Sequence, residues 1–486
     1  MTLFMGLDLG TQGARCLVTD GQGDVKAAHS VSYTRINIAG EPNQYEQNPA
    51  DWEQAAFTAI AACVAQVREQ GLDPAAIRSV SIDGTSGTIV PLDQNGSPLR
   101  AALMYNDMRA RDEARTVHEA CQDVERRMGL RFNASFSLPR LLWLKNNQPD
   151  IYTRPRYFAH QMDYIVGLLC GEFAVSDYSN ALKTGYDLVN GCWPAAISDS
   201  LGLDPGKLPR IIAPGAPIAP LTSAAAARLG LSTRTMVVGG STDGYASALA
   251  AGANTAGAWA SIIGTSFVLK GVTEQLVIDP SGSCYSHRLP SGAWMIGGAS
   301  NIGGRCLNQN FNPAEFAGFE PQVEAATPTG VVSYPLTGVG ERFPFVDPNA
   351  AAFFSRPVTG LTLYAALMEG VALAERLTFE RMIRIGCPVG DVIYTSGGAC
   401  RSDSWLRIRA SVLNRQLMVP DTVDAAMGSA ILAAADHFSS LEEASRHMIH
   451  FSKTVDPVAA KVAPYNELYG QFARECRQRY QLGFEP

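Results

Sequence analysis

The stretch Gly6-Leu7-Asp8-Leu9-Gly10-Thr11-Gln12-Gly13-Ala14-Arg15 decides the fold: an apolar strand runs into an acid, a Gly-Thr turn and a base. An acid at a strand end, beside a turn with free backbone N–H groups, can hold a magnesium ion and surround a phosphate. A second Gly-Thr turn, Gly264-Thr265, follows the apolar segment 258–263 about half a chain later. Two such turns predict a duplicated nucleotide-binding arrangement.

Length and composition favour two globular domains with no nucleic-acid partner. The chain has 486 residues, which exceeds the usual size of one domain, and 46% of them are hydrophobic. Its formal net charge of −7 and the lack of dense Lys or Arg runs offer no basic surface for nucleic acid.

The cysteines and the N-terminus indicate a cytoplasmic protein. Ten cysteines are scattered without a C-x-x-C pair, which is typical of small core residues in a reducing compartment. The opening residues lack a basic n-region, and no apolar stretch reaches membrane-spanning length without interruption. We therefore expect no signal peptide, no membrane partner, no zinc site and no disulfide framework.

The N-terminal segment has the pattern of an α/β layered domain: a three-stranded meander, then a helix, then a strand. Asn48-Pro49 signals the start of the helix, and apolar residues from Trp52 to Val67 keep helical spacing. The predicted elements are strands at 3–9, 15–20, 26–33 and 77–82 and a helix from about residue 49.

The rest of the chain contains a helical segment and a second α/β layer. Residues 107–230 are mostly helical in pattern, residues 213–220 read as a linker or exposed loop, and a domain boundary is expected near 240–255. A strand, the Gly397-Gly398 turn and a helix capped by Ser402 or Asp403 together form a plausible anion cradle. The other predicted elements are strands at 235–240, 258–263 and 392–395 and helices at 245–251, 361–384, 424–437 and 465–480, of which the last two would close the C-terminal domain.

Phosphate-binding loops of the P-loop and Rossmann types are absent, so a nucleotide must be held differently. Asp8 is the first candidate, because its carboxylate can bind magnesium through water while the turn amides and Arg15 meet phosphate oxygens. The alternative is a hairpin turn with a solvated acid. Asp243 is the second candidate, since it follows a buried strand and opens a helix, although it could be an ordinary N-cap.

Several other motifs have structural alternatives when each is taken alone. The Asp83–Gly87 loop could line a sugar pocket with hydroxyl groups or merely end a strand, and Asn106-Asp107 could bracket sugar hydroxyls or cap a helix. Gly264-Thr265 and Gly397-Gly398 could be ordinary turns.

The order of these motifs along nearly the whole chain resembles the FGGY carbohydrate kinases, which belong to the sugar kinase, heat-shock protein 70 and actin superfamily. The motifs are Asp8-Leu9-Gly10-Thr11, Asp83-Gly84-Thr85-Ser86-Gly87, Tyr105-Asn106-Asp107, Gly240-Ser241-Thr242-Asp243-Gly244, Ile263-Gly264-Thr265-Ser266, Gly340-Glu341-Arg342 and Ser396-Gly397-Gly398-Ala399.

The resemblance implies an α/β fold of two ribonuclease H-like, actin-like ATPase domains with an interdomain cleft. Residues 1–245 would form the N-terminal sugar-binding domain and residues 246–486 the C-terminal nucleotide-binding domain. Asp243 matches the catalytic base, which takes a proton from a terminal sugar hydroxyl as that hydroxyl attacks the γ-phosphate. Asp8 matches the acid near magnesium, so ATP and Mg²⁺ are the implied cofactors, with Asp8 and Asp243 as metal-site residues.

The resemblance also implies the binding residues. Thr85, Ser86, Asn106, Asp107 and Asp243 would contact the sugar. The nucleotide and its phosphates would be bound by Thr11, Gln12, Gly13, Arg15, Gly264, Thr265, Gly298, Gly303, Gly397, Gly398 and Ser402.

Two departures from the family pattern concern the sugar. The Asn106-Asp107 region looks like xylulokinases, whereas Asp83-Gly84-Thr85-Ser86 is more similar to ribulose-kinase branches. Gly244 stands where an amide side chain usually follows the base. We predict a ketopentose kinase, with D-xylulose as the first choice and ribulose as the second.

Three rival functions stay open at this point. Another sugar or polyol kinase of the same family would differ only in pocket residues. An actin- or chaperone-like ATPase would hydrolyse nucleotide regardless of sugar, and a non-catalytic sugar-binding regulator would be expected to lose Asp8 or Asp243. The oligomeric state is also open, with a homodimer as one option.

Overall fold

The computed structural model describes residues 1–484 and divides into two compact α/β units. The first unit contains Met1–Ala250, His287–Ala293 and Asp424–Ile449, and the second contains Ala251–Ser286, Trp294–Val423 and the segment from His450 onward. Within the described residues, no helix is long and apolar enough to cross a membrane.

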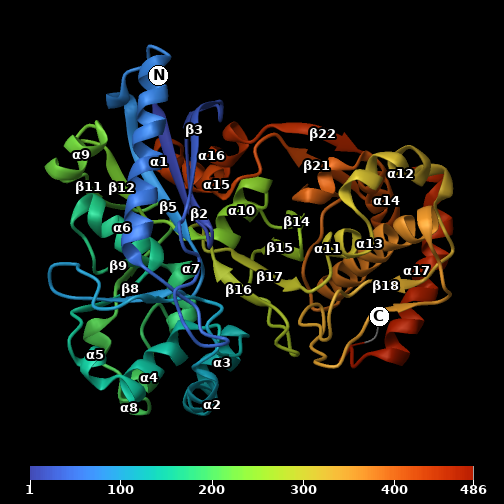
Figure 1. Cartoon of the computed structure of the whole chain (residues 1–486), viewed down its shortest axis with the longest axis horizontal. Helices are drawn as coiled ribbons and strands as arrows, with labels where there is room; N and C mark the ends of the chain where they lie inside the picture. Colours follow the sequence, from blue (N-terminus) through green and yellow to red (C-terminus); the bar gives the residue numbers. More distant parts are fainter. Residues whose placement is uncertain (485–486) are drawn as a thin grey trace. The chain divides into compact units, whose positions relative to one another are not determined.

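The first unit is built on a mixed sheet with the order β11-β12-β5-β1-β2-β3, and β13 also pairs with β5, at the carboxyl end of that strand. Figure 1 labels β11, β12, β5, β2 and β3 of this sheet. β1 runs antiparallel to β2 and parallel to β5. The strands are β1 (Leu3–Leu9), β2 (Gly13–Asp20), β3 (Val25–Ser32), β5 (Ile77–Gly84), β11 (Pro217–Pro220), β12 (Met236–Val238) and β13 (Ser241–Thr242). The predicted meander, helix and strand are confirmed.

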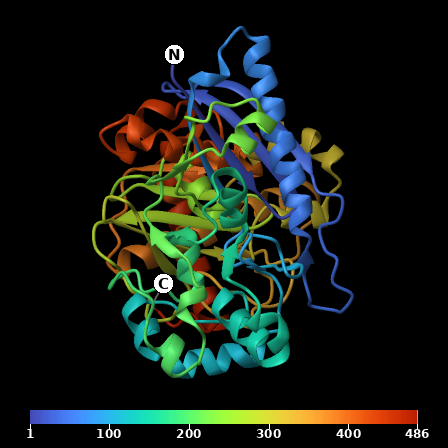
Figure 2. The same cartoon turned by 90° about the vertical axis from the view of Figure 1, so that its left-hand side faces the viewer.

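Alternation along β1 directs its side chains to two different helices. Leu7 and Leu9 join the core made with α1 (Pro49–Glu69), which Figure 2 shows lying along this sheet. Gly6 faces α15 (Ala425–Ala434), and a Cβ at Gly6 would lie 1.8 Å from the carbonyl oxygen of Ala426. Asp8 shares the side of the strand that faces α15, because it is two residues from Gly6.

Two predictions about elements of this unit are wrong. The helix predicted at 424–437 does not close the C-terminal domain, because α15 packs on β1 and β5 of the first unit. The segment 213–220, predicted as a linker or an exposed loop, is a loop only in its first half, because β11 in its second half forms the edge of the first sheet. Proline is tolerated there, since an edge strand leaves some N–H positions unpaired.

The remaining elements of the first unit lie around this sheet. They are a four-stranded sheet of β4 (Glu46–Gln47), β7 (Ala102–Leu103), β6 (Ile89–Leu92) and β8 (Tyr157–His160), a pair of β9 (Val175–Asp177) and β10 (Arg210–Ile212), and the helices α2 (Arg111–Ala120), α3 (Gln122–Met128), α4 (Ser137–Asn147), α5 (Pro149–Thr153), α6 (Gln161–Cys170), α7 (Tyr178–Ala181), α8 (Ala196–Asp199), α9 (Ser223–Leu229), α10 (Asp243–Ala251) and α16 (Leu441–Met448).

The second sheet has the order β16-β17-β15-β14-β20-β21-β22. Its strands are β14 (Trp259–Ile263), β15 (Phe267–Thr273), β16 (Tyr285–Arg288), β17 (Trp294–Ser300), β20 (Val392–Ser396), β21 (Gln416–Pro420) and β22 (Phe451–Val455). The other elements are the pair β18 (Ser333–Tyr334) and β19 (Phe353–Phe354) and the helices α11 (Arg305–Asn310), α12 (Pro313–Ala326), α13 (Gly360–Arg384), α14 (Asp403–Leu413) and α17 (Ala459–Arg479). The strands and the long helix predicted here are confirmed.

Glu369 on α13 is a fully buried acid that makes the stability of the second unit depend on pH. It accepts hydrogen bonds from the Thr329 hydroxyl and, at 3.0 Å, from the Tyr465 hydroxyl. Burial is the main cause that raises the pKa of Glu369 from 4.5 to about 7. When folding raises the pKa of an acid, the protonated acid stabilises the folded state. This stabilisation is fully present below the pKa of the unfolded chain and is lost as the pH rises through the pKa of the folded protein.

We therefore expect Glu369→Gln to gain stability relative to the wild type as pH rises from 5 to 8. The non-titrating amide avoids the ionisation cost, and the difference in unfolding free energy should move by about 2.5 kcal/mol in favour of the variant. Urea unfolding at each pH measures it. A difference that stays constant from pH 5 to pH 8 would contradict this assignment.

Candidate functional site

Three neighbouring strands of the first unit bring a set of carboxylates together. In the parallel β1–β5 pair Asp8 lies opposite Asp83, and in the parallel β13–β5 pair Ser241 lies opposite Asp83. Asp243 follows β13 directly and opens α10. Since parallel strands end at the same sheet edge, Asp8, Asp83 and Asp243 share one edge. The two acids predicted for the catalytic site, Asp8 and Asp243, therefore lie at the same edge of the sheet.

Asp8 is buried and paired with a cation. The antiparallel register of β1 and β2 places it opposite Arg15, whose Nη1 lies 2.8 Å from Asp8 Oδ2. Burial raises the pKa of Asp8, while hydrogen bonding with Asp83 and Arg15 opposes that shift. The Arg15 side chain is 43% exposed, so part of this cation faces solvent beside a buried acid.

Asp83, the first residue of the loop predicted to line a sugar pocket, belongs to this set, although no role was predicted for its carboxylate. Its side chain is fully buried, and Ser429 Oγ on α15 donates a hydrogen bond of 2.6 Å to Asp83 Oδ2. Burial first, and then the charge of Asp8, raise the pKa of Asp83 well above its usual range. The Asp8–Asp83 pair therefore carries less negative charge than two free carboxylates. Strand register was the signal that could have found it.

The β1–β2 turn contains the other residues predicted for the first phosphate loop. Gly10 N–H donates to Gly13 O at 3.0 Å, which closes the turn. Thr11 is half-buried, with its carbonyl accepting from Gln47 Nε2, and Gln12 is exposed. A Cβ at Gly13 would lie 2.3 Å from Val31 O, so packing against β3 already requires glycine there.

The two loops predicted to contact the sugar are held together by Arg140, which is fully buried. Its guanidinium donates to the carbonyl oxygens of Gly87 and Ser135 on one side and of Tyr105 and Asp107 on the other. The 84–87 loop and the 105–107 turn therefore form one structure. Because Thr242 pairs with Gly84, this structure begins beside Asp243.

The predicted sugar contacts differ in how their polar atoms are used. Asp107 is fully buried, and its carboxylate accepts from Tyr45 N and from the backbone and guanidinium of Arg109 at 2.7–3.0 Å. The Thr85 hydroxyl lies 2.6 Å from Gln161 Oε1 and 2.7 Å from Thr88 Oγ1. Both side chains are engaged within the protein, and their contact with sugar stays a prediction.

Several polar atoms in or beside these loops have no hydrogen-bond partner within residues 1–484. They include Ser86 Oγ, Asn106 Oδ1, Gln161 Nε2 and Arg140 Nε, and each atom is buried. Gln161, which the sequence analysis missed, is 1% exposed, and the N–H and hydroxyl of Thr85 fix its amide oxygen. Buried polar groups are normally paired, so these atoms are suited to a ligand with several hydroxyl groups.

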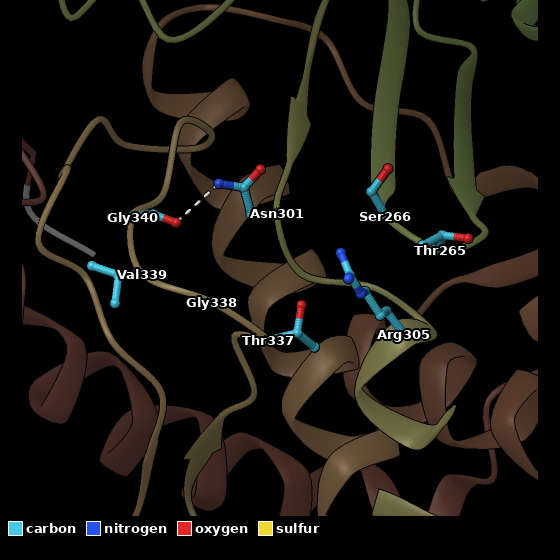
Figure 3. A pocket seen from close by; sticks show the side chains of 8 residues that line it. All are labelled: Thr265, Ser266, Asn301, Arg305, Thr337, Gly338, Val339 and Gly340. Atoms are coloured by element: carbon cyan, nitrogen blue, oxygen red, sulfur yellow. Dashed lines mark hydrogen bonds between the residues drawn. The ribbon is translucent and has the colours of Figure 1, made fainter. Parts of the chain in front are cut away.

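The second unit carries the second Gly-Thr turn. Gly264 N–H donates to Ser266 O at 3.0 Å, and the N–H groups of Gly304 and Arg305 donate back to the carbonyl oxygens of Gly264 and Thr265. A Cβ at Gly303 would lie 2.5 Å from Thr265 O, so a side chain there would displace the turn. A cavity of about 200 Å³ adjoins Thr265 (Figure 3).

The other predicted nucleotide contacts also lie in this unit. Gly397 has φ +94°, a left-handed conformation that favours glycine, and its absent Cβ would meet Ile263 O at 2.5 Å. Gly398 is open, whereas Gly298 packs under the ring of Phe343. The Ser402 hydroxyl accepts from Trp405 N as the cap of α14 and donates to Glu320.

The chain thus separates the predicted residues into two sets. One set, in the first unit, comprises Asp8, Thr11, Gln12, Gly13, Arg15, Thr85, Ser86, Asn106, Asp107 and Asp243, and the other, in the second unit, comprises Gly264, Thr265, Gly298, Gly303, Gly397, Gly398 and Ser402. The first set offers carboxylates and unpaired polar atoms, and the second offers a glycine-lined turn suited to phosphate.

The fold defines the class of protein first: two mixed α/β units of the actin-like ATPase type found in sugar kinases. The structure of xylulose kinase from Rhodospirillum rubrum superimposes with a TM-score of 0.87 at 25% identity, covering 98% of both chains. The structure of gluconate kinase from Lactobacillus acidophilus gives 0.87 at 22% identity, covering 99% of each chain.

Family models then identify the chain more closely. Residues 3–250 match the N-terminal domain, and residues 259–437 the C-terminal domain, of the FGGY family of carbohydrate kinases. The chain belongs to this family and is a phosphotransferase with an alcohol group as acceptor.

Curated relatives of two substrate types are about equally similar. Xylulose kinase from Bacillus subtilis is 27% identical, over 96% of this chain and 95% of its own length. Gluconokinase from Bacillus licheniformis is 26% identical, over 89% of this chain and 87% of its own length.

Proposed function

We propose that this kinase transfers the γ-phosphate of ATP to the terminal hydroxyl of a ketopentose, with D-xylulose as the first choice and ribulose as the second. The observation that carries the proposal is the shared sheet edge, where the β1–β5–β13 register gathers Asp8 and Asp243 beside the 84–87 loop. Phosphoryl transfer needs a proton acceptor, charge stabilisation and a positioned hydroxyl, and this edge has residues for each.

Asp243 acts as the base in this proposal. It is partly exposed, and its Oδ1 accepts from the N–H of Gly244 at 2.7 Å in the first turn of α10. The helix N-terminus favours the ionised carboxylate. The carboxylate takes the proton as the sugar oxygen forms its bond to phosphorus and the bond to the leaving ADP breaks. Arg15 would contact phosphate oxygens from its exposed side.

The carboxylates of Asp8 and Asp243 are suited to bind magnesium together with phosphate oxygens and water molecules. Within residues 1–484, no group of three His, Cys, Asp or Glu side chains could hold a metal ion. Mg²⁺ in phosphotransferases commonly uses one or two carboxylates together with water and phosphate oxygens. Asp8 and Asp243 would supply those carboxylates, and the bound ion would neutralise charge on the phosphates.

The ketopentose is favoured by the names of several curated relatives and by the unpaired polar atoms of the site. Relatives named xylulose kinase occur at 25–28% identity. Ser86, Asn106 and Gln161 offer a mixture of donors and acceptors to neutral hydroxyl groups. We also propose a cytoplasmic location and a homodimeric assembly.

We expect kcat/KM for D-xylulose to exceed that for D-gluconate and glycerol by at least about tenfold, because buried polar groups left unpaired by an analogue weaken its binding. A coupled assay of ADP release across D-xylulose, D-ribulose, L-ribulose, D-gluconate and glycerol measures the ratio. Preference for gluconate would overturn the pentose assignment while leaving the kinase class intact. ADP release that no sugar stimulates would favour the ATPase alternative.

A further inference from the structure

The cavity beside the second Gly-Thr turn contains a cation that the sequence analysis did not assign. Its lining consists of Thr265, Ser266, Asn301, Arg305 and the loop 337–340. Figure 3 shows Arg305 reaching from the start of α11 toward the space between Asn301 and Ser266. None of these lining residues is acidic, so the cavity presents one positive charge among hydroxyl and amide groups.

The nearest acid in sequence to the cavity loop is already satisfied elsewhere. Glu341 is 3% exposed, and its carboxylate accepts hydrogen bonds from Ser300 Oγ, Asn301 N, Arg342 N and the Tyr334 hydroxyl at 2.8–2.9 Å. These four donors point the carboxylate into the core. Glu341 is therefore not the counter-ion of Arg305.

The backbone of Arg305 is fixed by hydrogen bonds, whereas its guanidinium is exposed. Its N–H donates to Thr265 O at 3.3 Å, and the preceding Gly304 N–H donates to Gly264 O at 2.8 Å. Its side chain is exposed, and no ion pair or side-chain hydrogen bond engages it within residues 1–484. The Gly303 contact with Thr265 keeps this backbone close to the turn. The cation is thus fixed next to Thr265 without a protein partner.

We propose that Arg305 binds phosphate oxygens of the nucleotide at the Thr265 turn, and this inference rests on the proposed use of ATP. A guanidinium can donate two parallel hydrogen bonds to phosphate, which a lysine cannot reproduce. The cavity is smaller than the roughly 300–1,000 Å³ of complete small-molecule pockets, so it fits part of a nucleotide. Thr265, Ser266 and Asn301 also line this cavity, and the Asn301 amide nitrogen donates one hydrogen bond, of 2.9 Å, to Gly340 O (Figure 3).

The test compares Arg305→Gln, Arg305→Lys and the wild type by calorimetric titration with MgATP in the absence of sugar. We expect Arg305→Gln to raise the Kd for MgATP at least tenfold and Arg305→Lys to raise it less. In steady-state assays the KM for ATP should rise while the KM for sugar changes less than twofold. Arg384→Gln is the matched control, because Arg384 is an exposed arginine near the end of α13 that does not line the cavity.

Each outcome decides the inference. Equal MgATP affinity of Arg305→Gln and the wild type overturns it and leaves the kinase proposal standing. If wild-type protein binds no MgATP, both the ATP assignment and the Arg305 inference fail. Thermal unfolding of the variants should match the wild type, since the Arg305 side chain is exposed; a loss of affinity with an unchanged melting temperature therefore supports direct binding.

Discussion

Replacing Asp243 by Asn is expected to reduce kcat about a thousandfold, because the amide cannot accept the proton of the attacking hydroxyl. Asparagine keeps the shape of the side chain and can still accept the Gly244 N–H. The KM values for sugar and ATP should therefore stay within a few-fold of those of the wild type. Initial rates at saturating substrate, together with KM for each substrate, measure the effect.

Asp150→Asn is the matched control, since Asp150 is an exposed acid in the first turn of α5. It removes the same charge from a comparable helix position, so its kcat should equal that of the wild type. If Asp243→Asn retained kcat within a few-fold of the wild type, Asp243 would not be the base. Proton transfer would then have to involve another group at the sheet edge.

Replacing Glu375 by Gln is expected to lower the unfolding free energy by about 3 to 5 kcal/mol, because it leaves a charged partner buried without its counter-ion. Glu375 and Arg409 are both fully buried and make two hydrogen bonds of 2.8 Å. Ser261 on β14 bonds to both partners. The pair thus connects α13, α14 and β14 in the second unit.

Urea unfolding followed by intrinsic fluorescence measures this loss. Glu380→Gln is the control, because the Arg376–Glu380 pair lies on the same helix but its side chains are 21% and 31% exposed. That change should cost about 0.5 kcal/mol or less. The double change Glu375→Leu with Arg409→Met should recover much of the loss, since no unpaired charge remains. Equal costs for the two single changes would contradict the account.

Local patterns in the sequence predicted most of the fold. Apolar runs with acids at their ends indicated β1 and β5, and Asn48-Pro49 indicated the start of α1. Ser402 was predicted as one of two possible caps, and its side chain does cap α14. These features depend on residues a few positions apart, which is why a single sequence can reveal them.

Long-range pairing was not predictable in the same way. The sequence does not show that α15 packs on β1, although the small residues Gly6 and Ala426 make that close contact. The role of the Asp83 carboxylate and the presence of Gln161 at the site were not predicted. Asp83 interacts with Asp8 and Ser429, and Gln161 interacts with Thr85, and these partners are distant in sequence. The division of the chain at residues 245 and 246 stays a prediction, which separate expression of the two halves would test.

The fate of the γ-phosphate tests the central claim most directly. Wild-type protein is incubated with γ-³²P-labelled MgATP and D-xylulose, and the products are separated. The account predicts label on the sugar, at its terminal hydroxyl, in equal amount to the ADP formed, with little label in inorganic phosphate. Release of the label as inorganic phosphate at the same rate with and without any sugar of the panel would contradict it.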